Sequence, residues 1–194
     1  GMTSDQLILG MLSTPDIWKD VKMIKIQTPK LKKFLGVDVN EKYIAFSEVF
    51  KDGNYLLADE AEKALQTKPI ERGTYERDII KIDERLNIMY SVFNGSLFNI
   101  YPQVATKEDN SKWYNPLDAI QEFTGQNKTA IETITRGLIN SIVESKWEDA
   151  DNFISMISMY QKKVGADVML SDSKIEGEIF FNNLDIFFKL TLAY

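Results

Sequence analysis

The chain of 194 residues has no histidine and no cysteine, and its 29 acidic residues outnumber 23 basic ones to give a net charge of −6. These features exclude disulfides, thiolate nucleophiles, Ser-His-Asp triads and the common ligands of zinc and haem iron, and they argue against nucleic acid as a partner. With 44% hydrophobic residues, the chain is expected to fold as a single soluble domain, without catalytic residues, a metal site or a bound cofactor of its own.

Short elements are expected in the N-terminal third. Ser4 and Asp5 are capping residues that predict a short helix over residues 5–12. Prolines at the first helical position predict two more, one from Pro15 and one from Pro29 that Gly36 ends. Apolar and β-branched residues predict strands at 21–27 and 42–46. The turn signal Asp52-Gly53-Asn54 precedes a segment rich in Leu, Ala and Glu, which predicts a helix over residues 55–66.

The clearest periodic pattern follows. Apolar residues recur every three or four positions at Tyr75, Ile79, Ile82, Leu86, Met89 and Phe93. This spacing places them on one face of a helix, which Asn94-Gly95 ends. Residues 96–101 then read as an extended segment running into Pro102.

A helical hairpin is expected in the C-terminal half. Asn115-Pro116 opens a short helix that Thr124-Gly125 closes, and apolar periodicity predicts helices over residues 129–145 and 147–164. The link between the last two is so short that they must be antiparallel. Gly165 is expected to stop the second in a left-handed conformation, and Ser173 with Glu176 to cap a final helix. The predicted fold is therefore mainly α with a few short strands, an irregular helical domain containing this hairpin.

The C-terminal stretch is unusually apolar. Between Ile179 and Tyr194, 11 of 16 residues are apolar and cover almost every face of a helix. Such a helix is either a buried core helix or the approach to a membrane. A core helix would bury Phe180, Phe181, Phe187 and Phe188. A membrane approach would pack residues 173–184 on the domain and leave the last turns projecting, with Phe187, Phe188, Leu190 and Tyr194 proximal to the membrane.

Four blocks together resemble a known family. They read LILGMLSTPDIWKDVKMIKI, ERDIIKIDERLNIMYSVFNGSLFNIYP, KWYNPLDA and YQKKVGADVMLSDSKIEGEIFFNNLDIFFKL. Their order and spacing are similar to the soluble region of the large fused cytochrome c biogenesis membrane proteins of the system II type, which carry haem across the membrane and join it to apocytochrome.

The resemblance implies a domain cut from a larger membrane protein, tethered on the periplasmic side of the inner membrane, with residues 173–194 leading into a transmembrane segment. Its implied partners are the membrane part of its own chain and apocytochrome c. The family handles haem through a tryptophan-rich WWD segment and membrane histidines. This chain has neither, and Trp18, Trp113 and Trp147 are isolated. The resemblance therefore implies a non-enzymatic accessory role, either positioning apocytochrome or supporting haem delivery.

Two groups of residues are candidate binding sites. Trp113 and Tyr114 follow a polar loop and are candidates for contacting a peptide or the membrane domain, although Trp113 as a loop anchor is the simpler interpretation. Basic residues are locally concentrated at Lys22, Lys25, Lys30, Lys32 and Lys33, which would suit anionic headgroups or haem propionates, or form a solvated face.

Two alternatives to the family-based function remain open. The hairpin over 129–164 has the proportions of a tetratricopeptide unit, so a free-standing helical adaptor that binds peptides is the alternative function. An enzyme that uses carboxylates alone ranks third, because the adjacent acidic pairs Asp83-Glu84 and Glu148-Asp149 point in different directions on their helices.

Overall fold

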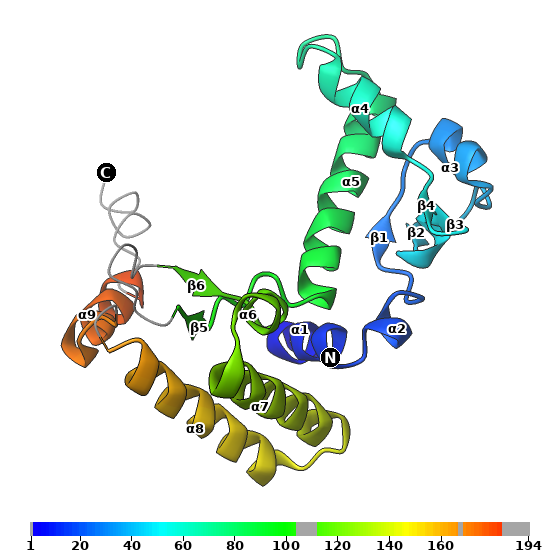
Figure 1. Ribbon diagram of the computed structural model, residues 1–194. Coiled ribbons are helices and arrows are strands. Elements are labelled where there is room, and N and C mark those ends of the chain that lie inside the picture. The colour runs from blue at the N-terminus through cyan, green and yellow to red at the C-terminus, as the bar shows by residue number, and fades with distance from the viewer. Residues whose placement is uncertain (1, 104–111, 167–168, 184–194) are drawn as a thin grey trace.

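The computed structural model describes residues 2–103, 112–166 and 169–183 (Figure 1). This part of the chain is 63% helical, with nine α-helices and three short antiparallel strand pairs. The prediction of a mainly α fold with a few short strands is confirmed.

The N-terminal half alternates short helices with two-residue strands before two longer helices. Its elements are α1 (Ser4–Ser13), α2 (Pro15–Trp18), β1 (Ile24–Lys25), α3 (Pro29–Leu35), β2 (Tyr43–Ile44), a 3-10 turn (Ser47–Val49), β3 (Phe50–Lys51), β4 (Asn54–Tyr55), α4 (Ala58–Gln66) and α5 (Thr74–Phe93). Strand β1 pairs with β2 in the register Ile24 to Ile44, and β3 pairs with β4.

The C-terminal half begins with one strand pair and continues as helices. Its elements are β5 (Tyr101–Pro102), β6 (Trp113–Tyr114), α6 (Pro116–Glu122), α7 (Gly125–Val143), α8 (Trp147–Val164) and α9 (Asp172–Asn183). Helices α7 and α8 pack together as the predicted antiparallel hairpin (Figure 1).

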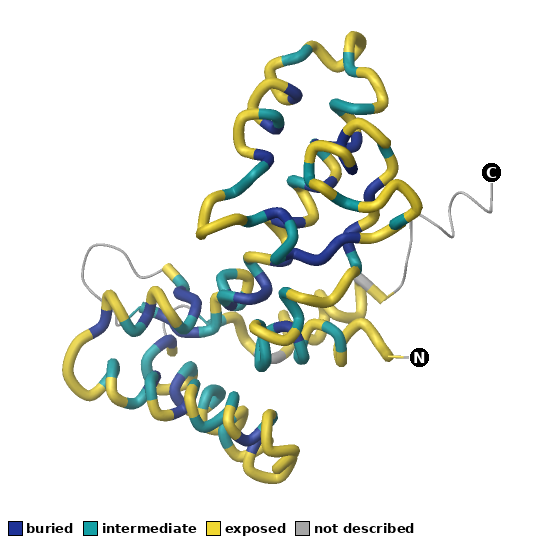
Figure 2. Tube along the Cα trace, turned by 90° about the vertical axis from the view of Figure 1, so that its right-hand side faces the viewer, coloured by how far each residue is buried: buried dark blue, intermediate teal, exposed yellow. Residues whose placement is uncertain are grey.

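The described residues bury two separate hydrophobic clusters (Figure 2). We call residues 2–94 the N-terminal lobe and the described residues after them the C-terminal lobe. The first cluster lies in the N-terminal lobe around α5, whose predicted apolar face is buried from Ile79 to Phe93. The second lies in the C-terminal lobe, where it joins β5, β6, α6, α7 and α8 through Tyr101, Tyr114, Ala119, Phe123, Ile131 and Tyr160. Helix α1 packs against both α5 and α7 and so connects the lobes.

The helix predicted over residues 55–66 begins later, at Ala58. Asn54 and Tyr55 instead form β4, which pairs with β3 around Asp52 and Gly53 at φ 51° and 80°. Two consecutive positive φ angles match the tight turn of a two-residue hairpin, so the turn residues selected a strand where helix propensity predicted a helix. Strand β6 was also not predicted, because its pairing with β5 joins residues distant in sequence.

Three predicted helix ends differ in the structure. Helix α7 begins at Gly125, four residues before the predicted start, and α9 begins at Asp172, which places Ser173 inside it. Gly165 ends α8 with φ −101°, so the predicted left-handed stop is wrong. The glycine is instead required by close packing, because a Cβ at this position would lie 2.8 Å from Cγ of Pro102.

Helix α9 carries large apolar side chains on its surface. Phe180 and Phe181 are 65% and 57% exposed, and Ile179 is exposed as well. A core helix would have buried these three side chains, and they are exposed. A membrane approach would have packed residues 173–184 on the domain, and these side chains do not show that packing either. Phe187, Phe188, Leu190 and Tyr194 lie outside the described residues. Within the described ranges, none of the helices has the length and apolarity needed to cross a membrane.

Candidate binding site

The predicted lysine cluster is spread over several environments. The Lys22 ammonium group donates a hydrogen bond to the Glu41 carboxylate at 2.9 Å, and this bond raises the pKa of Lys22. Lys32 is buried and donates to the backbone carbonyl of Val39 at 2.7 Å. Lys30 lies 3.9 Å from the ring centre of Tyr75. Each of these three ammonium groups thus already has a partner within the chain.

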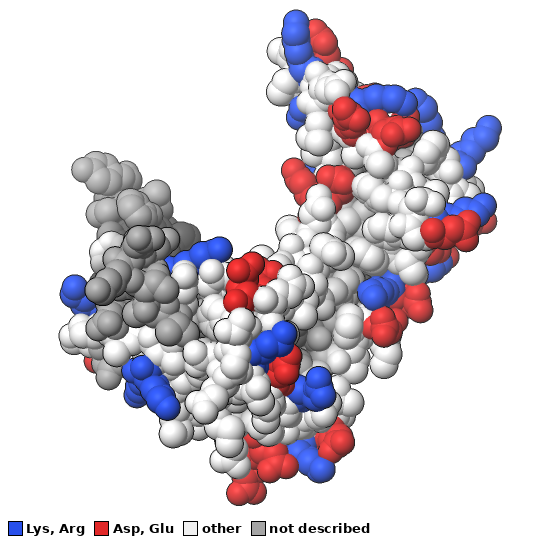
Figure 3. All heavy atoms as spheres, in the orientation of Figure 1, with Lys and Arg blue, Asp and Glu red and all other residues white. Residues whose placement is uncertain are grey.

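Lys25 and Lys33 complete the cluster with exposed side chains. On the face shown in Figure 3, basic side chains lie beside acidic ones and do not gather into one basic area. The assignment of these lysines to anionic ligands stays a prediction.

Trp113 and Tyr114 lie in β6, opposite Pro102 and Tyr101 of β5. Tyr114 is buried and packs edge-on against Phe123 with ring centres 5.2 Å apart, whereas Trp113 is half-buried. Tyr114 is therefore part of the C-terminal core. The partly exposed indole of Trp113 still offers a surface to a partner, and a binding role for either residue stays a prediction.

An apolar cavity to which both lobes contribute lies beside α1. This junction cavity has a volume of about 330 Å³ and is lined by Leu12, Asn94, Phe98, Ile100, Tyr101, Pro116, Leu117, Thr135, Leu138, Ile139 and Ile157. Leu12 and Asn94 come from the N-terminal lobe, and the α6, α7 and α8 side chains come from the C-terminal lobe. A cavity with these dimensions and lining is suited to apolar side chains of a ligand or partner.

Two hydroxyl groups of the junction cavity are paired with each other. The hydroxyls of Tyr101 and Thr135 lie 2.9 Å apart, and burial raises the pKa of Tyr101. Behind the cavity, the Gln161 side-chain amide donates to the carbonyl of Ile100 at 2.8 Å. The wall is thus held in place by hydrogen bonds while its surface stays apolar. Leu117, at 51% exposure, lies at the rim of the cavity.

Sequence reasoning missed this cavity. Its lining comes from five separate segments between Leu12 and Ile157, and no local spacing in the sequence reveals that they meet. The one sequence feature that bears on the cavity is the apolar face of the helix predicted over residues 129–145. That face was expected to pack only against the second helix of the hairpin. In the described part of the chain, no three acidic side chains come close enough to hold a metal ion.

Comparison with known proteins finds a relative that is similar along the whole of this chain. No family model matches the chain. The chain is 36% identical over 195 aligned positions to protein NrfI of Wolinella succinogenes, and the match includes 100% of the chain. The chain is homologous to one region of NrfI. It spans 21% of the length of NrfI, about a fifth. The match extends through both lobes, so the N-terminal and C-terminal clusters correspond to one continuous region of NrfI.

Proposed function

We propose that the chain is a non-enzymatic domain of a cytochrome c biogenesis membrane protein, in which it positions the haem-free cytochrome polypeptide. The observation that carries this proposal is the similarity to NrfI along the whole chain, which supports a role in cytochrome c biogenesis. We place the domain on the periplasmic side of the inner membrane, tethered beside the membrane part of the same protein.

An accessory role agrees with the chemistry of the chain. Histidine and cysteine supply most protein ligands to haem iron, and the sequence contains neither. Because the chain is only a fifth as long as NrfI, haem handling is assigned to the remaining parts of the protein. The domain then contributes binding and orientation to the reaction, without acid-base or nucleophilic chemistry.

The junction cavity is the proposed contact site for the polypeptide. A few side chains buried in well-packed pockets, aromatic ones prominent among them, supply most of the binding energy at protein interfaces. The cavity offers such a pocket, and Leu117 at its rim is accessible to a partner. Because both lobes contribute to the lining, a bound polypeptide would also fix the lobes relative to each other.

The test uses the full-length protein coexpressed with a reporter c-type cytochrome, and it measures covalently attached haem on denaturing gels. Leu117→Asp places a charge at the cavity rim and is expected to lower the haem signal several-fold, because an apolar contact then requires desolvating a carboxylate. Ile88→Asp is the control, since Ile88 on α5 is 61% exposed and lies outside the cavity. Equal signals from both variants, with equal protein levels, would contradict the proposal.

A further inference from the structure

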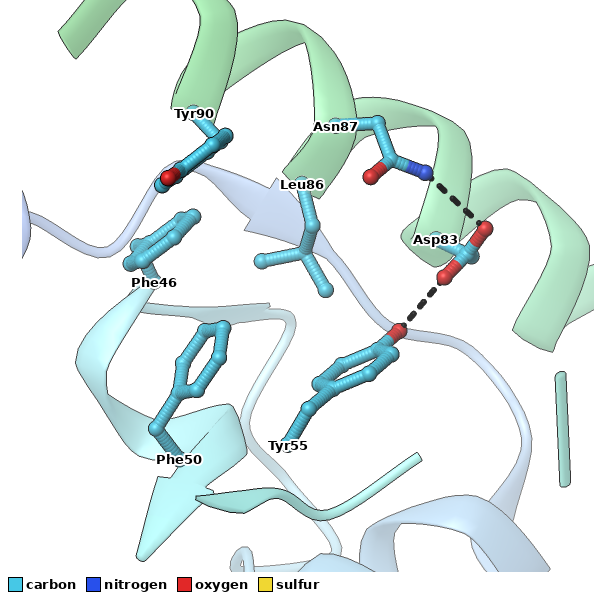
Figure 4. Close-up of a pocket in the computed structure, with 7 residues that line it drawn as sticks. All are labelled: Phe46, Phe50, Tyr55, Asp83, Leu86, Asn87 and Tyr90. Carbon is cyan, nitrogen blue, oxygen red and sulfur yellow. Dashed lines mark hydrogen bonds between the residues drawn. The ribbon is translucent and has the colours of Figure 1, made fainter. Parts of the chain in front are cut away.

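A second, smaller pocket lies on the N-terminal lobe between α5 and residues 46–55. Its volume is about 170 Å³, close to that of cavities that hold one benzene ring. Phe46, Phe50 and Tyr55 line one side, and Asp83, Leu86, Asn87 and Tyr90 of α5 line the other (Figure 4). The pocket is therefore large enough for one side chain and too small for a cofactor.

Four of its lining residues are aromatic. Phe46 and Phe50 are stacked with ring centres 4.9 Å apart, and the Tyr55 ring lies 5.4 Å from that of Phe50. Phe46 is buried, and its edge-to-face contact with Phe93 at 5.2 Å connects this row of rings to the core. Tyr90 is 60% exposed at the edge of the pocket. The rings are thus fixed by packing on one side and accessible on the other.

Asp83 is the only charged residue in the lining. Its carboxylate accepts hydrogen bonds from the Tyr55 hydroxyl at 2.8 Å and from the Asn87 side-chain amide at 3.1 Å (Figure 4). Burial and the adjacent carboxylate together raise the pKa of Tyr55 far above its ordinary value, so the hydroxyl remains a donor. Within the described residues, Asp83 forms no ion pair with a lysine or arginine. Its negative charge is held in place without being neutralised.

We propose that this pocket binds the cationic side chain of a lysine or arginine on a partner polypeptide. Aromatic faces attract alkylammonium and guanidinium groups, and a carboxylate fixed beside them adds a charge-assisted hydrogen bond. The aliphatic stem of the same side chain would cover Leu86 and the phenylalanine rings. This inference does not depend on the proposed function, because it follows from the pocket alone.

Other occupants fit the pocket less well. An apolar side chain would remove water from the Asp83 carboxylate without providing a countercharge, which is costly. An anion would be repelled by the same carboxylate. The ring faces and the single negative charge are complementary to one organic cation, and this complementarity is the basis for choosing a basic side chain.

The experiment uses NMR titration of the 194-residue chain with small probes. The probes are n-butylammonium, n-butylguanidinium and n-butanol, and the signals followed are the ring resonances of Phe46, Phe50, Tyr55 and Tyr90. We expect saturable shifts with one or both cations and at least fivefold weaker binding of n-butanol. The preferred cation identifies lysine or arginine. Equal binding of n-butanol and the cations, or no saturable shift with any probe, would overturn the proposal.

Three variants assign the binding to the pocket. Asp83→Asn keeps an oxygen acceptor for Tyr55 but removes the charge, and it is expected to weaken cation binding about tenfold. Glu84→Gln makes the same change of charge at the next, exposed residue of α5 and should leave binding unchanged. Tyr90→Leu removes the exposed ring and should weaken binding about threefold. Circular dichroism verifies the fold of each variant. If Asp83→Asn and Glu84→Gln weaken binding equally, the effect is general electrostatics and the pocket assignment is wrong.

Discussion

The carboxylate of Asp78 in α5 accepts a hydrogen bond at 2.7 Å from the backbone N–H of Thr28, which lies 50 positions earlier in the sequence. It also accepts from the N–H of Gln27 at 3.0 Å and from the Thr28 hydroxyl. Asp78 is buried, and its three donors lie where β1 leads into α3. One side chain therefore connects the N-terminal segment to the central helix.

Asp78→Ala should destabilise the chain by about 2–3 kcal/mol, because two backbone N–H groups and the Thr28 hydroxyl lose the charged acceptor that they share. Urea unfolding measures the loss. Asp151→Ala is the control at an exposed position of α8, where surface substitutions usually change stability by less than ~0.5 kcal/mol. Equal effects of the two substitutions would show that the Asp78 contacts contribute little.

Two glycines in the C-terminal lobe should respond oppositely to alanine. At Gly165 the added Cβ would lie 2.8 Å from Cγ of Pro102 and 2.9 Å from the carbonyl oxygen of Gln161, whereas at Gly177 nothing lies within 4 Å. Gly165→Ala is expected to cost about 1–3 kcal/mol through overpacking. Gly177→Ala, inside α9, is expected to stabilise that helix by up to ~1 kcal/mol.

Thermal unfolding followed by circular dichroism measures both glycine variants. The prediction concerns the sign of the difference between them. A Gly165→Ala variant as stable as the parent chain would mean that β5 and the end of α8 are not held in close contact.

The C-terminal core should lose stability at alkaline pH. Burial and the neighbouring Tyr101 raise the pKa of Tyr160 from 10.0 to about 12. A folded-state pKa above the unfolded value means that the folded protein holds the proton more tightly, so this contribution is complete below pH 10 and is lost as the pH rises through about 12. Unfolding experiments between pH 8 and about 12 should show that decline.

Tyr160→Phe separates this effect from general alkaline unfolding. The Tyr160 hydroxyl is buried and has no hydrogen-bond partner in the described part of the chain. Its removal should therefore cost little at pH 7 or increase stability, and it should reduce the alkaline decline. Tyr101→Phe is the comparison, because it loses the contact with Thr135 and should cost about 1 kcal/mol. A larger loss from Tyr160→Phe than from Tyr101→Phe would contradict this assignment.

Local sequence signals predicted the helices well. The α5 face from Ile79 to Phe93 and the α7–α8 hairpin followed from apolar spacing, and Asn115 caps α6 as its position before Pro116 indicated. Such signals act within a few turns of one helix. The conformation at helix ends was predicted less accurately. Gly165, for example, is required by close packing against Pro102 and not by a left-handed backbone.

The candidate sites depend on contacts between distant segments and were not predicted. The junction cavity brings Leu12 together with Leu138 and Ile157, and the aromatic pocket places Phe46 beside Tyr90. Asp83 was considered only as half of an adjacent acidic pair, whereas its hydrogen bond to Tyr55 depends on the unpredicted β3–β4 hairpin. Without that hairpin, no sequence pattern indicated an aromatic pocket at this position.

The exposed apolar face of α9 should bind lipid. The double substitution Phe180→Ser and Phe181→Ser should leave the melting temperature nearly unchanged, since both rings are more than half exposed. It should also reduce cosedimentation of the chain with phosphatidylcholine vesicles, because burial of two rings in the interface is lost. Unchanged cosedimentation would argue against a membrane-adjacent position for this helix.

The most direct test of the proposed function is site-specific crosslinking in the full-length protein. A photoreactive phenylalanine analogue replaces Leu117 at the rim of the junction cavity, and the protein is coexpressed with a c-type cytochrome whose haem attachment is blocked. The account predicts a crosslinked product that contains the haem-free cytochrome, and little or none when the analogue replaces Ile88 instead. Equal yields at the two positions, or no cytochrome crosslinked at position 117, would contradict the claim that this domain positions apocytochrome.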